Sequence, residues 1–173
     1  MIVSVRKRRA PSRASRPLVS QPSQSPPRPV VPLPVEGAVE MVFPDGLLGL
    51  PACRRFRLTK YQPEDGSASP FLLLQCQDEN MSLPILDPRW LAPEYHFSIA
   101  PDVLTYLKAH TVEELSTLAI VTVRNRMEDM TINLQGPLVV NLTSQLGLQM
   151  VVEQFPVRHP LFVRTEEKHV AAK

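Results

Sequence analysis

Several residue types that mark other protein classes are scarce in this sequence. Its 173 residues include only two cysteines, Cys53 and Cys76, which are too few for a disulfide framework and indicate a reducing compartment. No segment approaches the run of about 18 apolar residues that a membrane-spanning helix needs. The N-terminus also lacks the apolar segment of a secretory signal. We therefore expect a soluble, cytoplasmic protein without a membrane span.

Motifs that carry catalysis or hold metals are also missing. No glycine-rich phosphate loop or nucleophile elbow occurs. Asp45, Asp87 and Glu94 are expected to be solvated turn carboxylates rather than an acid–base pair. The histidines lie far apart, without a pair at the spacing of zinc ligands; they are His96, His110, His159 and His169. We predict a protein that is not an enzyme and that binds no metal and no cofactor.

The small net charge of +2 hides two segments of opposite charge. Residues 1–35 contain seven basic residues and no acidic residue, and they hold eight of the 19 prolines. The remaining residues contain 12 basic and 17 acidic side chains, so they carry a net charge of −5. High proline content, like charges and no apolar periodicity predict a disordered arm with polyproline character over residues 1–35.

A basic cluster lies near the start of this arm, at Arg6, Lys7, Arg8 and Arg9. Such a cluster is compatible with contact to nucleic acid, with contact to an anionic membrane, with an Arg- and Ser-rich transit peptide, or with a solvated tail that has no fixed partner. These four interpretations remain open.

Apolar and polar residues alternate most clearly between residues 118 and 153. Met130, Ile132 and Leu134, for example, would share one face of an extended segment. Because the polar breaks are short, we predict four strands joined as an antiparallel meander, at residues 118–123, 130–134, 138–142 and 148–153. Further extended segments are predicted at residues 38–43, 55–58, 70–76, 82–86 and 95–99.

Only one stretch favours a helix. Pro101 suits a first helical position, and Val103 and Leu107 share one helical face, so we predict a helix over residues 101–109. Residues 111–114 have the spacing of a capping box and predict a second short turn. The pattern therefore indicates a mainly β domain at residues 36–165 with one or two short helices, followed by a C-terminal tail at residues 166–173.

A series of segments occurs in order between about residues 36 and 162: FPDGLLGLP, RRFRL, PFLLLQ, ILDPRWLAPEYHFSI, LAIVTV, TINLQGPLVVN, LGLQMVV and VRHPL. In their order and approximate spacing, these segments resemble the bacterial flagellar assembly factor FliW family. The chain departs from the family at Leu48, where proline is usual, at Leu50, where an aromatic residue is usual, and at Gly136, where alanine is common.

The resemblance implies a small antiparallel β-barrel-like protein that is not an enzyme. Proteins of this family bind flagellin in the cytoplasm and also bind CsrA, an RNA-binding translational regulator. When export lowers free flagellin, such a protein is released to bind CsrA, which then stops repressing flagellin translation. By the same resemblance, apolar helical segments of flagellin are expected to lie in a groove on the barrel.

Five residues are candidates for partner contact: Asn133, Gly136, Pro137, Asn141 and Gln149. The three polar side chains interrupt strands that are otherwise apolar, and Asn133 lies in the TINLQGPLVVN segment. The alternative for these three is the solvent face of a half-buried strand. For Gly136 and Pro137 the alternative is a role in shaping a hairpin.

The rival function is a small nucleic-acid-binding module that uses the basic arm. Such a module would stack bases on Trp90, Tyr95 or Phe97. Only ten aromatic residues occur in the chain, which disfavours this function. An acidic core would also repel RNA, so direct contact with nucleic acid is expected for the arm rather than for the core.

Overall fold

The computed structural model describes residue 33 and residues 35–162. The helix α1 spans Pro101–Tyr106, and the single-turn 3-10 helices are η1 (Pro88–Trp90), η2 (Val112–Glu114) and η3 (Met127–Asp129). The strands are β1 (Ala38–Val42), β2 (Arg55–Lys60), β3 (Leu72–Cys76), β4 (Met81–Leu86), β5 (Ser116–Thr122), β6 (Thr131–Ile132), β7 (Leu138–Asn141), β8 (Leu146–Gln149) and β9 (His159–Pro160). The prediction of a mainly β, barrel-like fold is confirmed. The tail at residues 166–173 lies outside the described residues.

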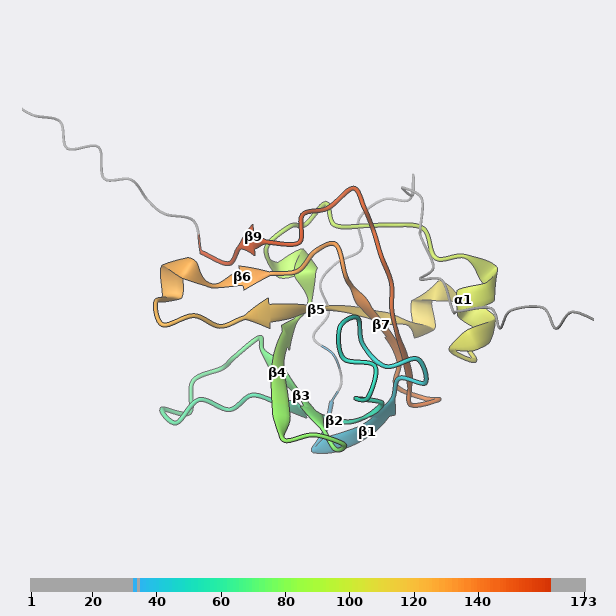
Figure 1. Cartoon of the computed structure of the whole chain (residues 1–173), viewed down its shortest axis with the longest axis horizontal. Helices are drawn as coiled ribbons and strands as arrows, with labels where there is room; N and C mark the ends of the chain where they lie inside the picture. The colour runs from blue at the N-terminus through green and yellow to red at the C-terminus, as the bar shows by residue number, and fades with distance from the viewer. Residues whose placement is uncertain (1–32, 34, 163–173) are drawn as a thin grey trace, which may run out of the picture.

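Seven of these strands close into a barrel (Figure 1). Strands β1 to β4 pair antiparallel in chain order, and β4 then pairs with β5, where Ile85 lies opposite Ile120. Strand β5 pairs with β7 and β7 with β8. The ring closes where Val42 of β1 lies beside Leu146 of β8 in a short parallel contact. Strands β6 and β9 extend the sheet beside the C-terminal end of β5.

The inward faces of the strands build the main core. In β2, Phe56 and Leu58 are fully buried while Arg55 and Arg57 are exposed, as expected from side chains that alternate between two faces. Phe43 packs edge-on against Phe56, with ring centroids 5.3 Å apart. Burial of one such large apolar side chain contributes roughly 1.5–3 kcal/mol of transfer free energy. This core is what allows the short strands to hold together.

Strand β7 is buried on both of its faces. Leu138 points into the main core, whereas Val139 belongs to a second apolar cluster that includes Val103 and Leu107 from the α1 region. Because α1 covers the outer face of β7, this strand has no solvent face, although its sequence alternates between two faces. Figure 1 shows α1 outside the barrel on the side of β7.

The predicted antiparallel meander is wrong in one respect. Strand β6 does not pair with β7; both instead pair with β5, β7 along residues 116–118 and β6 along residues 121–122. The connection stays beside β5, since the Asn133 N–H donates to the Ile120 carbonyl at 2.9 Å. Strand β5 is long enough to hold both short strands end to end, so no hairpin forms at residues 133–137.

The predicted strand at residues 95–99 is also wrong, because this segment joins no sheet. The segment is irregular, and contacts of its apolar side chains hold it in place. Tyr95 is buried and its hydroxyl donates to the Leu134 carbonyl at 2.7 Å. Its ring also packs against Phe97 and Phe155 at centroid distances of 5.7 and 4.3 Å.

The helix begins at Pro101 as predicted but ends earlier than residue 109. Lys108 takes a left-handed conformation with φ of 54°. The Lys108 N–H donates to the Thr105 carbonyl and the Ala109 N–H to the Leu104 carbonyl, which is the hydrogen-bond pattern of a Schellman ending. Glycine usually occupies the left-handed position, so a lysine there gave no stop signal in the sequence.

The predicted turn at residues 111–114 exists as η2, but the capping-box hydrogen bond does not form. Thr111 makes no side-chain capping bond. The Glu114 carboxylate instead accepts the His110 N–H at 3.2 Å.

Residues 33 and 35 of the predicted arm lie within the folded domain. Val35 is fully buried in the main core, and Leu33 packs against it. The rest of the predicted arm, including Arg6, Lys7, Arg8 and Arg9, lies outside the described residues. Among the helices that the described residues form, none has the length and apolar character that a bilayer crossing requires.

Candidate partner-binding surfaces

Gln149 connects two segments that are far apart in the sequence. Its side-chain Oε1 accepts the Leu48 N–H at 2.7 Å, and its Nε2 donates to the Gly136 carbonyl at 3.1 Å. The residue is only 8% exposed. One buried amide therefore joins the turn at residues 44–51 to the connection between β6 and β7.

Gly136 allows this amide to approach closely. A Cβ built there would lie 2.9 Å from Nε2 of Gln149 and 3.0 Å from Nδ2 of Asn133. The Asn133 Oδ1 in turn accepts the Gly136 N–H at 2.9 Å, and the Pro137 carbonyl accepts the Met150 N–H at 2.9 Å. Gly136 and Pro137 therefore shape this connection and its contact with β8, and not a hairpin.

The turn held by Gln149, which we call the Leu48 turn (residues 44–51), has one exposed large hydrophobic side chain. Leu48 is 53% exposed, whereas Leu47 is buried and faces Leu50 through backbone hydrogen bonds in both directions. Gly46 and Gly49 adopt φ values of 70° and 81°, which side chains disfavour. The turn is thus rigidly supported on its inner side and presents Leu48 to solvent.

Strand β8 supports the same turn from below through Gly147. A Cβ on Gly147 would lie 2.4 Å from the ring of Phe43. The ring of Phe43 therefore rests directly on the β8 backbone, immediately before the Leu48 turn begins.

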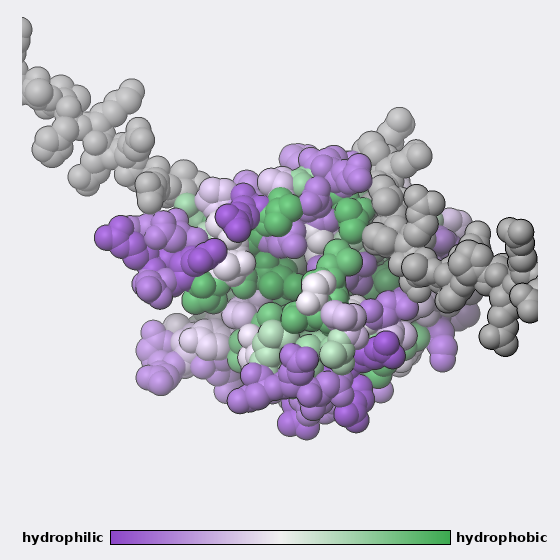
Figure 2. All heavy atoms as spheres, viewed as in Figure 1, coloured by the Kyte–Doolittle hydropathy of each residue, from purple (hydrophilic) through white to green (hydrophobic). Residues whose placement is uncertain are grey.

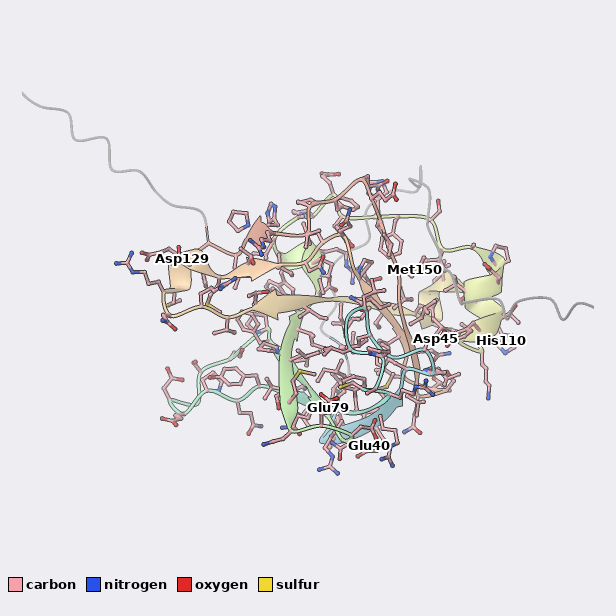
Figure 3. The ribbon with its side chains drawn as sticks, in the orientation of Figure 1. Glu40, Asp45, Glu79, His110, Asp129 and Met150 are labelled. Atoms are coloured by element: carbon pink, nitrogen blue, oxygen red, sulfur yellow. The ribbon has the colours of Figure 1, made fainter. Side chains whose placement is uncertain are left out.

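The α1 region contacts the other side of the Leu48 turn. The Tyr106 hydroxyl donates to Oδ2 of Asp45 at 2.8 Å, and burial together with this carboxylate raises the pKa of Tyr106 to about 12. Figure 3 shows Asp45 on the α1 side of the barrel, where His110 also lies. The phenol therefore stays protonated and able to donate at neutral pH.

Asn141 lies apart from the other four predicted contact residues. It is 1% exposed, and its Nδ2 donates to the Leu107 carbonyl at 3.0 Å while its Oδ1 accepts the Thr143 N–H at 3.0 Å. The Ser144 hydroxyl adds a bond to the same Leu107 carbonyl at 2.7 Å. Asn141 thus ties the end of α1 to the turn between β7 and β8.

The structure therefore brings Asn133, Gly136, Pro137 and Gln149 together and leaves Asn141 elsewhere. The solvent-face alternative is wrong for Asn141 and Gln149, because both side chains are buried by tertiary contacts. Direct contact of these residues with a partner stays a prediction. Leu48, the exposed side chain on the turn that Gln149 holds, was not among the predicted candidates; its only sequence signal was its departure from the family's usual proline.

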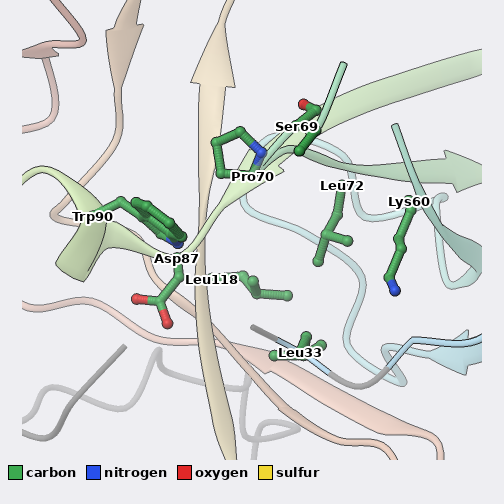
Figure 4. Close-up of a pocket in the computed structure, with 9 residues that line it drawn as sticks. Leu33, Lys60, Ser69, Pro70, Leu72, Asp87, Trp90 and Leu118 are labelled. Atoms are coloured by element: carbon green, nitrogen blue, oxygen red, sulfur yellow. The ribbon is translucent and has the colours of Figure 1, made fainter. Parts of the chain in front are cut away.

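A second concave feature, which we call the Trp90 pocket, has a volume of about 400 Å³. Figure 4 shows Trp90 and Pro70 on one side, Lys60 across from them, and Leu33 and Leu118 below. The residues that line it are Leu33, Lys60, Ala68, Ser69, Pro70, Leu72, Asp87, Trp90 and Leu118. They come from segments spread over 85 positions, so no local sequence pattern could predict the pocket.

The three aromatic residues that were predicted to stack bases do not share an open surface in the described part of the chain. Trp90 is 52% exposed, but Tyr95 is only 3% exposed and burial raises its pKa. Phe97 is partly buried against the same cluster as Tyr95. Because a stacking platform needs open ring faces, these three aromatic residues do not form one.

Titratable groups in the described part of the chain do not gather into a metal site, since no three His, Cys, Asp or Glu side chains there are placed to hold an ion. Cys53 and Cys76 are both buried, free thiols. The pKa of Cys53 is raised to about 12, mainly by a hydrogen bond with the thiol of Cys76 and in addition by burial. Its sulfur is therefore a thiol rather than a reactive thiolate at neutral pH.

Two surface ion pairs lie on the outer face of the barrel near β1 and β2. Asp78 accepts from the backbone N–H and guanidinium of Arg55, and these bonds lower the pKa of Asp78 to about 2. Arg57 pairs with Glu40 across β1 and β2 at 3.0 Å. Figure 2 shows apolar residues near the middle of the viewed face with hydrophilic side chains around them.

Comparison with known proteins decides the family. The family model described as FliW protein matches residues 31–161, which include both candidate surfaces. The chain belongs to the FliW family. A flagellar assembly factor FliW of Desulfitobacterium hafniense is 32% identical over 123 residues, covering 69% of this chain and 78% of that protein. The FliW of Clostridium kluyveri is 27% identical over 124 residues, covering 70% and 83%.

A solved structure has the same fold. The crystal structure of the flagellar assembly factor FliW superimposes with a TM-score of 0.64 at 24% sequence identity, covering 73% of this chain and 87% of that one. The closed barrel described above is therefore the FliW fold, and the predicted family is confirmed.

Proposed function

We propose that this protein is a non-catalytic, cytoplasmic flagellar assembly factor that binds flagellin and the regulator CsrA in turn. When flagellin is exported, the freed protein binds CsrA and relieves its repression of flagellin synthesis. The observation that carries this proposal is the FliW family match across residues 31–161. The geometry supports it because the described residues build a closed barrel that presents side chains such as Leu48 to solvent.

The Leu48 turn is the surface best suited to flagellin. Apolar helical segments bind where an exposed apolar side chain lies on a pre-organised support, because little ordering free energy is then lost on binding. Leu48 is exposed on a turn that is fixed by Gln149 on one side and by the Tyr106 contact with Asp45 on the other. In this proposal Asn133, Gly136, Pro137 and Gln149 act by holding the turn.

The charge of the chain suits a basic second partner. Residues 36–173 carry a net charge of −5, which attracts a positively charged RNA-binding protein and repels RNA. Such attraction mainly raises the association rate, and it weakens as salt screens the charges. We therefore expect CsrA association to slow with rising ionic strength more steeply than flagellin association does.

A mixing experiment tests the function. The full chain is run on a sizing column with flagellin, with CsrA, with both and with RNA alone. We expect co-elution with each protein and displacement of CsrA as flagellin is added. Co-elution with neither protein would overturn the proposal, and a shift with RNA alone would favour the nucleic-acid-binding module instead.

A substitution tests the surface separately from the function. Leu48→Asp places a charge on the exposed tip and is expected to weaken flagellin binding at least about tenfold, or roughly 1.4 kcal/mol. Val123→Asp is the matched control, because Val123 is similarly exposed, at 56%, but lies after β5 and away from the Leu48 turn. Equal titration curves for both variants would show that flagellin binds elsewhere on the barrel.

A further inference from the structure

The Trp90 pocket is apolar on most of its walls and contains the only tryptophan of the chain. Pro70 and the half-exposed ring of Trp90 form one wall, Leu72 lies across from them, and Leu118 is almost fully buried at the bottom. Lys60 is the basic side chain at the rim. An aromatic ring with one open face and an apolar floor is the arrangement that binds extended, proline-containing peptides.

The position of Leu33 shows which peptide lies nearest to this pocket. Leu33 lines the pocket itself, and the Val35 N–H donates to the Leu33 carbonyl at 2.7 Å, which fixes the chain at this point. Val35 is fully buried in the main core, so the chain at residues 33 and 35 connects the pocket to the core. In the sequence, the residues nearest to this point of the pocket are those just before Leu33.

The sequence just before Leu33 has the composition that such a pocket recognises. Residues 26–32 read PPRPVVP, with four prolines in seven residues. Proline-rich segments favour the polyproline II conformation, which rises about 3.1 Å per residue, so a seven-residue segment in that conformation would span roughly 22 Å. Little conformational entropy is lost when such a segment docks, because its backbone is already restricted.

We propose that residues 26–32 dock into the Trp90 pocket of their own chain and stack a proline ring on Trp90. The indole N–H is a donor that can bond a carbonyl of the docked segment. Tethering at Leu33 gives the segment a millimolar effective concentration, so even a weak contact is populated. This proposal is independent of whether the protein binds flagellin.

Trp90 provides the test, because its fluorescence is the only tryptophan signal in the full-length protein. The test variant replaces Pro26, Pro27, Pro29 and Pro32 with serine in the full chain. We expect a shift of Trp90 emission to longer wavelength and an increase of about twofold in the acrylamide quenching constant, because the ring loses contacting atoms. Circular dichroism verifies that the barrel is unchanged, as all four prolines lie outside the described fold.

The matched control replaces Pro11, Pro17 and Pro22, which lie further from Leu33, with serine. This control should leave Trp90 emission and quenching as in the unmodified chain. A synthetic peptide of residues 22–32 added to the four-proline variant should restore the protection of Trp90, and a scrambled peptide should not. The proposal is overturned if the four-proline variant matches the unmodified chain, if the control changes Trp90 equally, or if the peptide fails to restore protection.

Discussion

Replacing Gln149 with leucine tests whether one buried amide holds the Leu48 turn in place. The substitution preserves approximate size but removes the bond from the Leu48 N–H and the bond to the Gly136 carbonyl. The buried Gly136 carbonyl then lacks its partner, which costs about 1–3 kcal/mol, while the N–H on the exposed turn can bond water and loses about 0.5–1.5 kcal/mol. We expect Gln149→Leu to lower the free energy of unfolding by about 2–4 kcal/mol.

The measurement is urea denaturation followed by far-UV circular dichroism, together with hydrogen exchange of the Leu48 amide. Gln154→Leu is the control, since Gln154 is exposed and makes one long bond, 3.3 Å, to the His96 carbonyl. Exposed substitutions of this kind change stability by no more than about 0.5 kcal/mol. The reasoning is refuted if both variants have the same urea midpoint, or if the Leu48 amide remains protected when Gln149 is replaced.

Three further predictions follow from the described contacts. Gly147→Ala should lower the thermal midpoint, because the added Cβ would lie 2.4 Å from the ring of Phe43 and would displace this buried side chain. Such overpacking lowers the free energy of unfolding by about 1–3 kcal/mol or more, and an unchanged melting curve would contradict this packing. The Cys53 thiol, with a pKa of about 12, should not react with Ellman's reagent at pH 8 until the protein unfolds, so rapid labelling of the native protein would contradict its burial. Hydrogen bonds from Arg55 lower the pKa of Asp78 to about 2. The stabilising effect of the Asp78 carboxylate should therefore be complete above its unfolded pKa of roughly 3.9 and be lost as the pH falls towards 2. Asp78→Asn should remove this part of the acid-denaturation curve.

Local patterns were sufficient to predict most elements of this fold. The alternation of Phe56 and Leu58 with arginines placed β2 correctly, because residues two apart in a strand share a face. Pro101 marked the start of α1, because its ring sets a helical φ and its missing N–H is not needed in the first turn. Quoted segments such as TINLQGPLVVN also indicated the family, which the comparison confirmed.

The candidate surfaces were harder to predict, because each depends on residues distant in the sequence. Leu48 and Gln149 are 101 positions apart, yet their hydrogen bond decides that Gln149 is buried. A glutamine in a strand of alternating apolar and polar residues gives the same sequence pattern whether its side-chain amide bonds to water or to another backbone segment. The Trp90 pocket likewise needs Leu33, Trp90 and Leu118 to meet.

The sequence by itself determined most of the strands, where the helix begins and which family the chain resembles, because these properties depend on neighbours within a few positions. Only the tertiary structure decided that β7 pairs with β5, that β1 closes the ring against β8, and that Asn141 and Gln149 lie inside. Strand pairing and burial depend on which distant segments exclude water from one another, and a one-dimensional pattern of apolar and polar residues does not contain that choice.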